Sequence, residues 1–289
     1  MALFIGFMSG LFWSFFDITR KLSLKIIKPE ILLFLFSISQ IVVFSLWMIF
    51  DNFFLNIANY FFVGFLLILI SIFSAILFLK ALNLSEISMS IPLLSFSPIF
   101  SAIFANFLLN EKLISQQYIG IFMIVIGTLV LYSEKTKSYN LKESFKKIFL
   151  NKGSRYMLIV SLIWSITPIL DKICLNHSSM NAHGLIQSIG MFVCLIYIYS
   201  INIKKIISVY KVQYKLITST LTIGVVATVL QFYAITLLPV PVMESVKRSI
   251  GQSFSIFYGK FYFSEQINKQ KILGILSICL GVFLVLILL

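Results

Sequence analysis

Charged residues are scarce in this chain of 289 residues. They make up 11% of it, whereas 60% of the residues are hydrophobic. A soluble globular domain is about 45–50% apolar and about 25% charged. A single core in water could not bury this much apolar surface. The composition therefore excludes a soluble protein and predicts that the lipid bilayer is the solvent.

Cysteine and histidine are also sparse. The three cysteines, Cys174, Cys194 and Cys279, are far apart, each in an apolar stretch. This spacing indicates neither a disulfide framework nor a metal site. The two histidines, His177 and His183, are expected in a short connection that offers no metal-ligand set. We therefore expect no metal and no cofactor.

Acidic residues number ten against 23 lysines and arginines, which gives a net charge of +13. In a soluble protein this excess would suggest nucleic-acid binding. Here the basic residues lie between apolar runs, where anionic lipid headgroups are the simpler partner. We therefore expect contacts with membrane lipids and none with nucleic acid.

Long apolar runs dominate what remains. A membrane-spanning helix needs about 20 mostly apolar residues. Ten such segments follow one another, at 2–24, 31–50, 61–82, 87–109, 116–133, 156–175, 183–202, 217–238, 241–263 and 271–289. The runs are continuous rather than alternating, which argues against barrel strands. The predicted fold class is an all-α membrane protein of ten transmembrane helices, the first of them retained rather than cleaved as a signal peptide.

Prolines inside two of these segments predict bends, because proline interrupts the helical hydrogen-bond pattern. Pro92 and Pro98 lie in the fourth segment, and Pro168 lies in the sixth.

The longest connection, residues 134–155, has its own pattern. Leu141, Phe145, Ile148 and Phe149 fall on one helical face, while three lysines fall on others. This is typical of a basic helix that lies on the membrane surface. We expect it to separate a five-helix repeat over residues 1–133 from a second one over residues 156–289.

An internal duplication supports the two repeats. Trp13-Ser14, Arg20-Lys21 and Leu24 recur as Trp164-Ser165, Asp171-Lys172 and Leu175. Glu111, Gly120 and Gly127 recur as Glu265, Gly274 and Gly281 at nearly the same spacing. Because each repeat holds an odd number of spans, the second enters the membrane upside down. Inverted repeats are typical of alternating-access carriers with a site at the repeat interface.

With these motifs, the chain resembles EamA-type ten-helix members of the drug/metabolite transporter superfamily over nearly its whole length. The Trp-Ser of each first helix and the Glu and two Gly that end each repeat carry the resemblance. The stretch from Ser245 to Glu265 is similar to the ninth helix of the sugar-phosphate and nucleotide-sugar branches. The resemblance implies a solute carrier with a central cavity lined by both halves. The arginine common in the second helix of EamA relatives is absent, so no relative's substrate is carried over.

Charges inside an apolar span must face a cavity or a partner, because each costs about 2.5–3.5 kcal/mol at mid-helix. Lys247 and Arg248 lie inside the ninth segment, with Glu244 one turn before them. A purely structural Glu244–Arg248 pair is one interpretation. The other is that Lys247 and Arg248 attract an anionic group of the substrate, as the resemblance to the sugar-phosphate branch also implies.

For several other residues, too, a structural and a functional interpretation are both open. Asp17 either pairs with Lys21 or couples transport to an ion or proton, a role also considered for Glu244. Lys80 either reaches the membrane surface or adds a second cation to the cavity. Trp13, Trp164 and Tyr233 either line the cavity or pack against other helices. Glu111 and Glu265 are expected to cap the turn and helix that follow them, and Gly120 and Gly274 to allow close helix packing.

The predicted function is a secondary transporter of an anionic or zwitterionic metabolite, multi-pass in the inner (plasma) membrane, as a monomer or homodimer. The alternatives are a membrane-embedded transferase acting on a lipid-linked substrate, and a channel or assembly subunit. The orientation is open: the positive-inside rule places both termini away from the cytoplasm, while the family resemblance implies the reverse. A reporter fused to Leu289 distinguishes these orientations.

Overall fold

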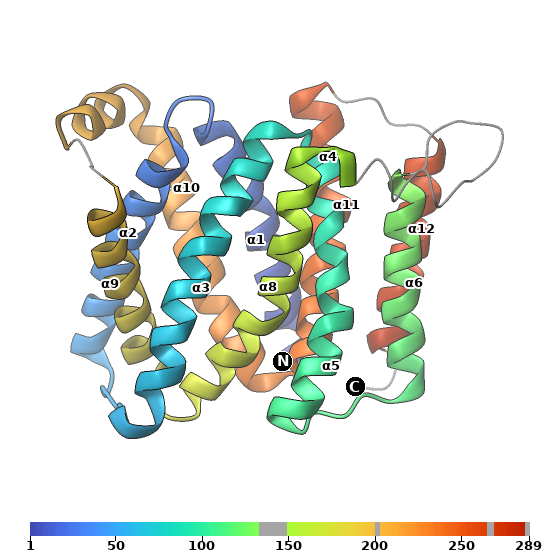
Figure 1. The fold of residues 1–289 in the computed structure, drawn as a ribbon, viewed down its shortest axis with the longest axis horizontal. Coiled ribbons are helices and arrows are strands. Elements are labelled where there is room, and N and C mark those ends of the chain that lie inside the picture. The colour runs from blue at the N-terminus through green and yellow to red at the C-terminus, as the bar shows by residue number, and fades with distance from the viewer. Residues whose placement is uncertain (133–148, 200–202, 265–268, 287–289) are drawn as a thin grey trace.

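A computed structural model describes residues 1–132, 149–199, 203–264 and 269–286, and within these ranges the chain is a bundle of helices (Figure 1). The first repeat contains α1 (Ala2–Ser23), α2 (Pro29–Phe50), α3 (Ile57–Leu84), α4 (Ile87–Ser90), η1 (Ile91–Phe96), α5 (Ser97–Leu109) and α6 (Ser115–Tyr132). The second contains α8 (Lys152–Leu175), α9 (Met180–Ile198), α10 (Ile203–Leu237), α11 (Val240–Phe263) and α12 (Lys269–Leu286).

These helices follow the ten expected segments. Six of them are long and apolar enough to cross a membrane: α1, α2, α3, α8, α9 and the part of α10 from Gln213. The fourth segment, α6 and α12 supply shorter apolar helices. In the described ranges, the pairing of extended backbone is limited to one isolated bridge, between Leu55 and Ser178. The all-α membrane fold is therefore confirmed.

The fourth segment is broken, as its prolines predict. A 3₁₀ helix, η1, separates α4 from α5, with a proline at the start of both η1 and α5. Proline supplies no backbone N–H, so the regular α-helical bonding is interrupted there. By contrast, α8 continues through Pro168 as one helix from Lys152 to Leu175.

The eighth segment is longer than expected. α10 begins at Ile203, well before residue 217, and changes direction at Gln213, whose φ of −121° and ψ of 28° are not helical. The expected boundary was wrong because apolarity marks only the membrane-crossing part of a helix, and the preceding lysine-rich turns are polar. The predicted surface helix falls largely on residues 133–148, outside the described residues.

Packing between the repeats follows a twofold pattern. α1 packs along α10, and α8, the equivalent of α1, packs along α3, the equivalent of α10. α2 packs on its equivalent α9, and α6 on its equivalent α12. α8 ends beside the connection from α2 to α3, where Asn56 N donates to His177 O. That connection lies at the end of the bundle where α1 begins, so α8 ends where α1 starts (Figure 1). α1 and α8 therefore run in opposite directions, and the two five-helix repeats are inverted (Figure 1).

Candidate functional site

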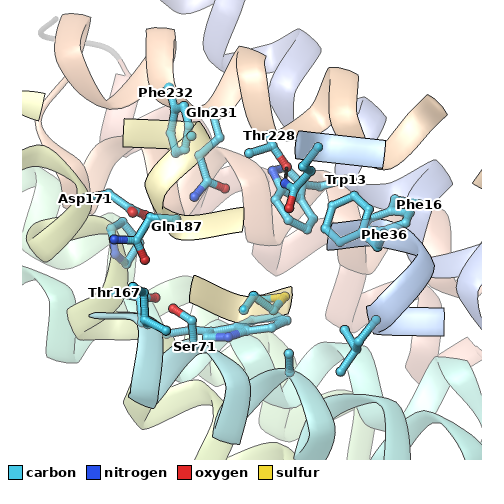
Figure 2. A pocket seen from close by; sticks show the side chains of 18 of the residues that line it. Trp13, Phe16, Phe36, Ser71, Thr167, Asp171, Gln187, Thr228, Gln231 and Phe232 are labelled. Carbon is cyan, nitrogen blue, oxygen red and sulfur yellow. Dashed lines mark hydrogen bonds between the residues drawn. The ribbon is translucent and has the colours of Figure 1, made fainter. Parts of the chain in front are cut away.

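A cavity of about 180 Å³ lies between the two repeats. Its wall comes from α1, α2 and α3 of the first repeat and from α8, α9, α10 and α11 of the second. Figure 2 shows aromatic and polar side chains facing one another across it, with Trp13, Phe16 and Phe36 on one side and Asp171, Gln187 and Thr167 on the other. This places the cavity at the repeat interface, as the sequence predicts.

Lys247 and Arg248 line this cavity, and the side chain of each is only 7% exposed. α11 presents both because it starts at Val240, directly after Pro239, and runs into the centre of the bundle. Lys247 Nζ donates to Gln231 Oε1 over 2.9 Å, and Arg248 Nε donates to Ser97 Oγ over 3.0 Å. Both cations are thus held by polar partners instead of facing lipid.

Glu244 lies between the two cations and is fully buried. One carboxylate oxygen pairs with Lys247, and the other lies 2.8 Å from Arg248 Nη2 and accepts a hydrogen bond from Ser97 Oγ. The predicted Glu244–Arg248 pair is therefore present. Two cations share one carboxylate, which leaves one positive charge in excess at this wall.

The two repeat-related tryptophans flank this pair. Lys247 Nζ is 5.5 Å from the Trp13 ring centroid, and Arg248 Cζ is 5.1 Å from that of Trp164. Trp164 Nε1 donates to Ser74 Oγ over 3.1 Å. Trp13 Nε1 is buried and has no hydrogen-bond partner among the described residues. Both rings line the cavity.

Arg20 is a third cation in the cavity wall. Its guanidinium lies between the rings of Phe16 and Phe78, 4.2 and 4.4 Å from their centroids, and pairs with Asp17. Asp17 thus pairs with Arg20 and not with Lys21, the partner that one of the two interpretations gave it. Lys21 Nζ donates instead to the backbone oxygen of Ser85 over 2.8 Å, at the end of α1.

Two sequence candidates lie elsewhere. Tyr233 is 38% exposed and stacks on Trp47, with centroids 6.2 Å apart. Its neighbours Gln231 and Phe232 line the cavity, because successive helical residues point about 100° apart. Lys80 is exposed near the end of α3 and does not line the cavity. For both residues the structure agrees with the non-functional alternative: Tyr233 packs against another helix, and Lys80 is exposed near a helix end.

Glu111 joins the two repeats at one end of the bundle. Its carboxylate lies 2.6 Å from Lys172 Nζ and accepts the backbone N–H of Val240 over 2.7 Å. We expected Glu111 to cap the next helix along the chain. The helix that it caps is instead α11 of the other repeat. A carboxylate there meets the positive end of the helix dipole. The equivalent Glu265 lies outside the described residues.

The repeated glycines pack α6 against α12. A Cβ on Gly120 would lie 2.5 Å from the backbone oxygen of Gly281, and one on Gly127 would lie 2.7 Å from that of Gly274. The crossed pairing of equivalent positions is what a twofold axis between the repeats produces.

Several cavity residues were missed as site candidates from the sequence. Gln40, Gln187, Thr228 and Gln231 line the cavity, and Gln40 Nε2 donates to Thr228 Oγ1 over 3.2 Å. His183 is not in a connection but in the first turn of α9, fully buried. Glutamines inside apolar spans are the signal that could have identified three of these residues.

Comparisons with known proteins agree with this architecture. The model of the EamA-like transporter family matches residues 1–133 and 151–287. The chain belongs to the EamA-like transporter family. Membership of this family favours a transporter over the membrane-embedded transferase. The matches do not extend to a sugar-phosphate branch, which stays a prediction.

One relative and one structure are similar over large parts of the chain. "Uncharacterized transporter YoaV" of Bacillus subtilis (strain 168) is 24% identical over 194 residues, which are 65% of this chain and 62% of that protein. The match thus spans less than two thirds of the relative's length. A solved crystal structure with 16% identity superposes with a TM-score of 0.67, over 99% of this chain and 96% of its own. This likeness concerns the fold alone.

Proposed function

We propose that this EamA-family protein is a secondary transporter that moves a small anionic or zwitterionic metabolite across the inner membrane by alternating access. The observation that supports this most is the Lys247–Arg248 pair in the cavity wall, opposed by the single carboxylate of Glu244. A cation in excess inside a low-dielectric wall attracts an anionic group strongly. The inverted repeats support this proposal, because they are typical of carriers that work by alternating access.

The size of the cavity narrows the substrate. Pockets for drug-sized ligands have volumes of about 300–1,000 Å³. At about 180 Å³, this cavity suits a metabolite of amino-acid or short carboxylate size rather than a nucleotide sugar.

Replacing Lys247 by glutamine tests the proposal. Lys247→Gln keeps a polar side chain and removes the excess charge, so uptake of anionic and zwitterionic solutes into liposomes that contain the purified protein should fall to background. The matched control is Lys80→Gln, at the exposed position on α3, which should transport like the wild type. Unchanged uptake by Lys247→Gln would contradict the proposal.

Asp17 and Glu244 are the proposed coupling groups. Both are carboxylates paired with a cation beside the cavity, so protonation of either would release that cation. Uptake by the same liposomes, measured with and without a proton gradient, tests this role. Equal uptake in the two conditions would exclude it.

A further inference from the structure

The wall of the cavity opposite Trp13 carries a negative charge. Asp171 lines the cavity from α8, with its side chain 14% exposed (Figure 2). In the first repeat the equivalent residue is Arg20, so the duplication has placed opposite charges at related positions. The equivalent of Asp17, which neutralises Arg20, is Pro168. Within α8, Asp171 therefore has no ion-pair partner, whereas Arg20 has one within α1.

A buried chain of hydrogen bonds holds Asp171 on the side away from the cavity. His183 Nε2 lies 3.0 Å from Asp171 Oδ1, and His183 Nδ1 lies 2.8 Å from the hydroxyl of Tyr60. Gln187 Nε2 donates to the same hydroxyl over 3.1 Å and to Gly64 O over 3.1 Å. These groups come from α3, α8 and α9, so the two repeats hold the carboxylate together.

The donors in this chain can be ordered. The Tyr60 oxygen accepts from Gln187, and its own proton is free to point to His183 Nδ1, an order of donors that leaves the His183 proton on Nε2. That proton is donated to Asp171 Oδ1. In this order each donor points toward the carboxylate of Asp171. Among the described residues, no hydrogen bond reaches the other oxygen, Oδ2.

The cavity is therefore dipolar. One wall has the excess positive charge of Lys247 and Arg248 over Glu244, and the other has Asp171. Asp171 and Lys247 interact electrostatically, but Lys247 forms its ion pair with Glu244 and, in the described part of the chain, none with Asp171. A substrate with a single negative charge would neutralise one wall and leave Asp171 without a counter-charge. Buried charges without a partner are costly.

We infer that Asp171 binds the ammonium group of a zwitterionic substrate of amino-acid size, while Lys247 and Arg248 bind its carboxylate. This inference rests on the proposed transport function and specifies its substrate class. Such a substrate pairs both walls at once and leaves the occupied cavity neutral. His183 and Tyr60 are positioning residues, because they hold Asp171 through hydrogen bonds and neither of them lines the cavity.

Ligand binding to the purified full chain tests the inference. Trp13 and Trp164 line the cavity, so their fluorescence should change on binding. The probes are the standard α-amino acids and, for each, the carboxylate with the same side chain but no amino group. The wild type should bind an amino acid more tightly than its matched carboxylate by a factor of about 30 or more, the lower end of the loss for a buried charge pair without one partner.

Two variants separate the roles of the walls. Asp171→Asn should reduce amino-acid affinity to that of the matched carboxylate and leave carboxylate affinity unreduced. Lys247→Gln should weaken both classes. If Asp171→Asn does not fold, two measurements remain. The comparison between probes in the wild type needs no variant, and Asp171→Glu, which keeps the charge, should retain a preference for amino acids.

The outcomes distinguish the two proposals. Equal wild-type affinities for both classes, or an equal loss of both in Asp171→Asn, would overturn the zwitterion inference and leave an anion carrier. Binding of neither class would overturn the proposed function as well.

Discussion

Glu244 allows two cations to remain buried in α11. It is fully buried and pairs with both Lys247 and Arg248, while Ser97 bridges the carboxylate and the guanidinium. Removing one partner of a buried pair leaves an uncompensated charge, which typically costs about 3–5 kcal/mol.

Glu244→Gln should therefore destabilise the protein by about 3–5 kcal/mol, since it keeps the shape of the side chain and leaves two cations unopposed. Denaturant unfolding in detergent, followed by loss of helical signal, measures this. Glu86→Gln, at an exposed carboxylate, is the control and should change little. If both variants unfold at the same denaturant concentration, Glu244 is not the counter-charge described here.

At the residue scale, the sequence shows which charged residues lie inside a membrane span more readily than it shows which way a side chain points. Lys247, Arg248, Trp13 and Trp164 could be predicted, because charge inside an apolar run and repetition at related positions are visible in the letters. The exposed position of Tyr233 could not be predicted, because successive residues on a helix face different surroundings and no pattern states which face meets the cavity. The partnership of His183 with Asp171 depends on the packing of α9 against α8 and α3, which no sequence motif encodes.

Glycines on both helices allow α6 and α12 to approach each other closely. The Cβ of any other residue at position 120 would lie 2.5 Å from the backbone oxygen of Gly281. Backbone atoms cannot rotate away as a side chain can, so the helices would have to separate.

Gly120→Val should lower the stability of the protein by about 1–3 kcal/mol, the usual cost of overpacking. Thermal unfolding of the detergent-solubilised protein is the measurement. Gly251→Ala is the control, because a Cβ there meets its nearest neighbour, Ile91, at 3.9 Å. Equal midpoints for Gly120→Val and the wild type would show that α6 and α12 do not pack as described.

At the element scale, the sequence predicts which segments form helices and where prolines interrupt the fourth. It predicts less well where helices end. α10 starts fourteen residues before its expected start at residue 217, at Ile203, because a helix can continue through polar turns beyond the membrane. Glu111 was expected to cap its neighbour in sequence, yet it caps α11, since only the folded bundle brings the two repeats together.

At the scale of the whole molecule, the two inverted bundles enclose a hollow lined mainly by apolar side chains, with a few charged and amide groups among them. Its lining joins residues from both halves, and Lys247, Arg248 and Asp171 each have a polar partner from another helix. The central claim is that water and solutes reach this hollow, while the outer faces of the same helices meet lipid.

Cysteine labelling of α10 tests that claim most directly. In a chain with Cys174, Cys194 and Cys279 replaced by alanine, Thr228→Cys places a thiol in the cavity wall, and Thr222→Cys places one on an exposed face of the same helix. A charged, water-soluble thiol reagent applied to the protein in liposomes should modify Thr228→Cys and leave Thr222→Cys unmodified in lipid. Modification of Thr222→Cys with Thr228→Cys unreactive would contradict the account.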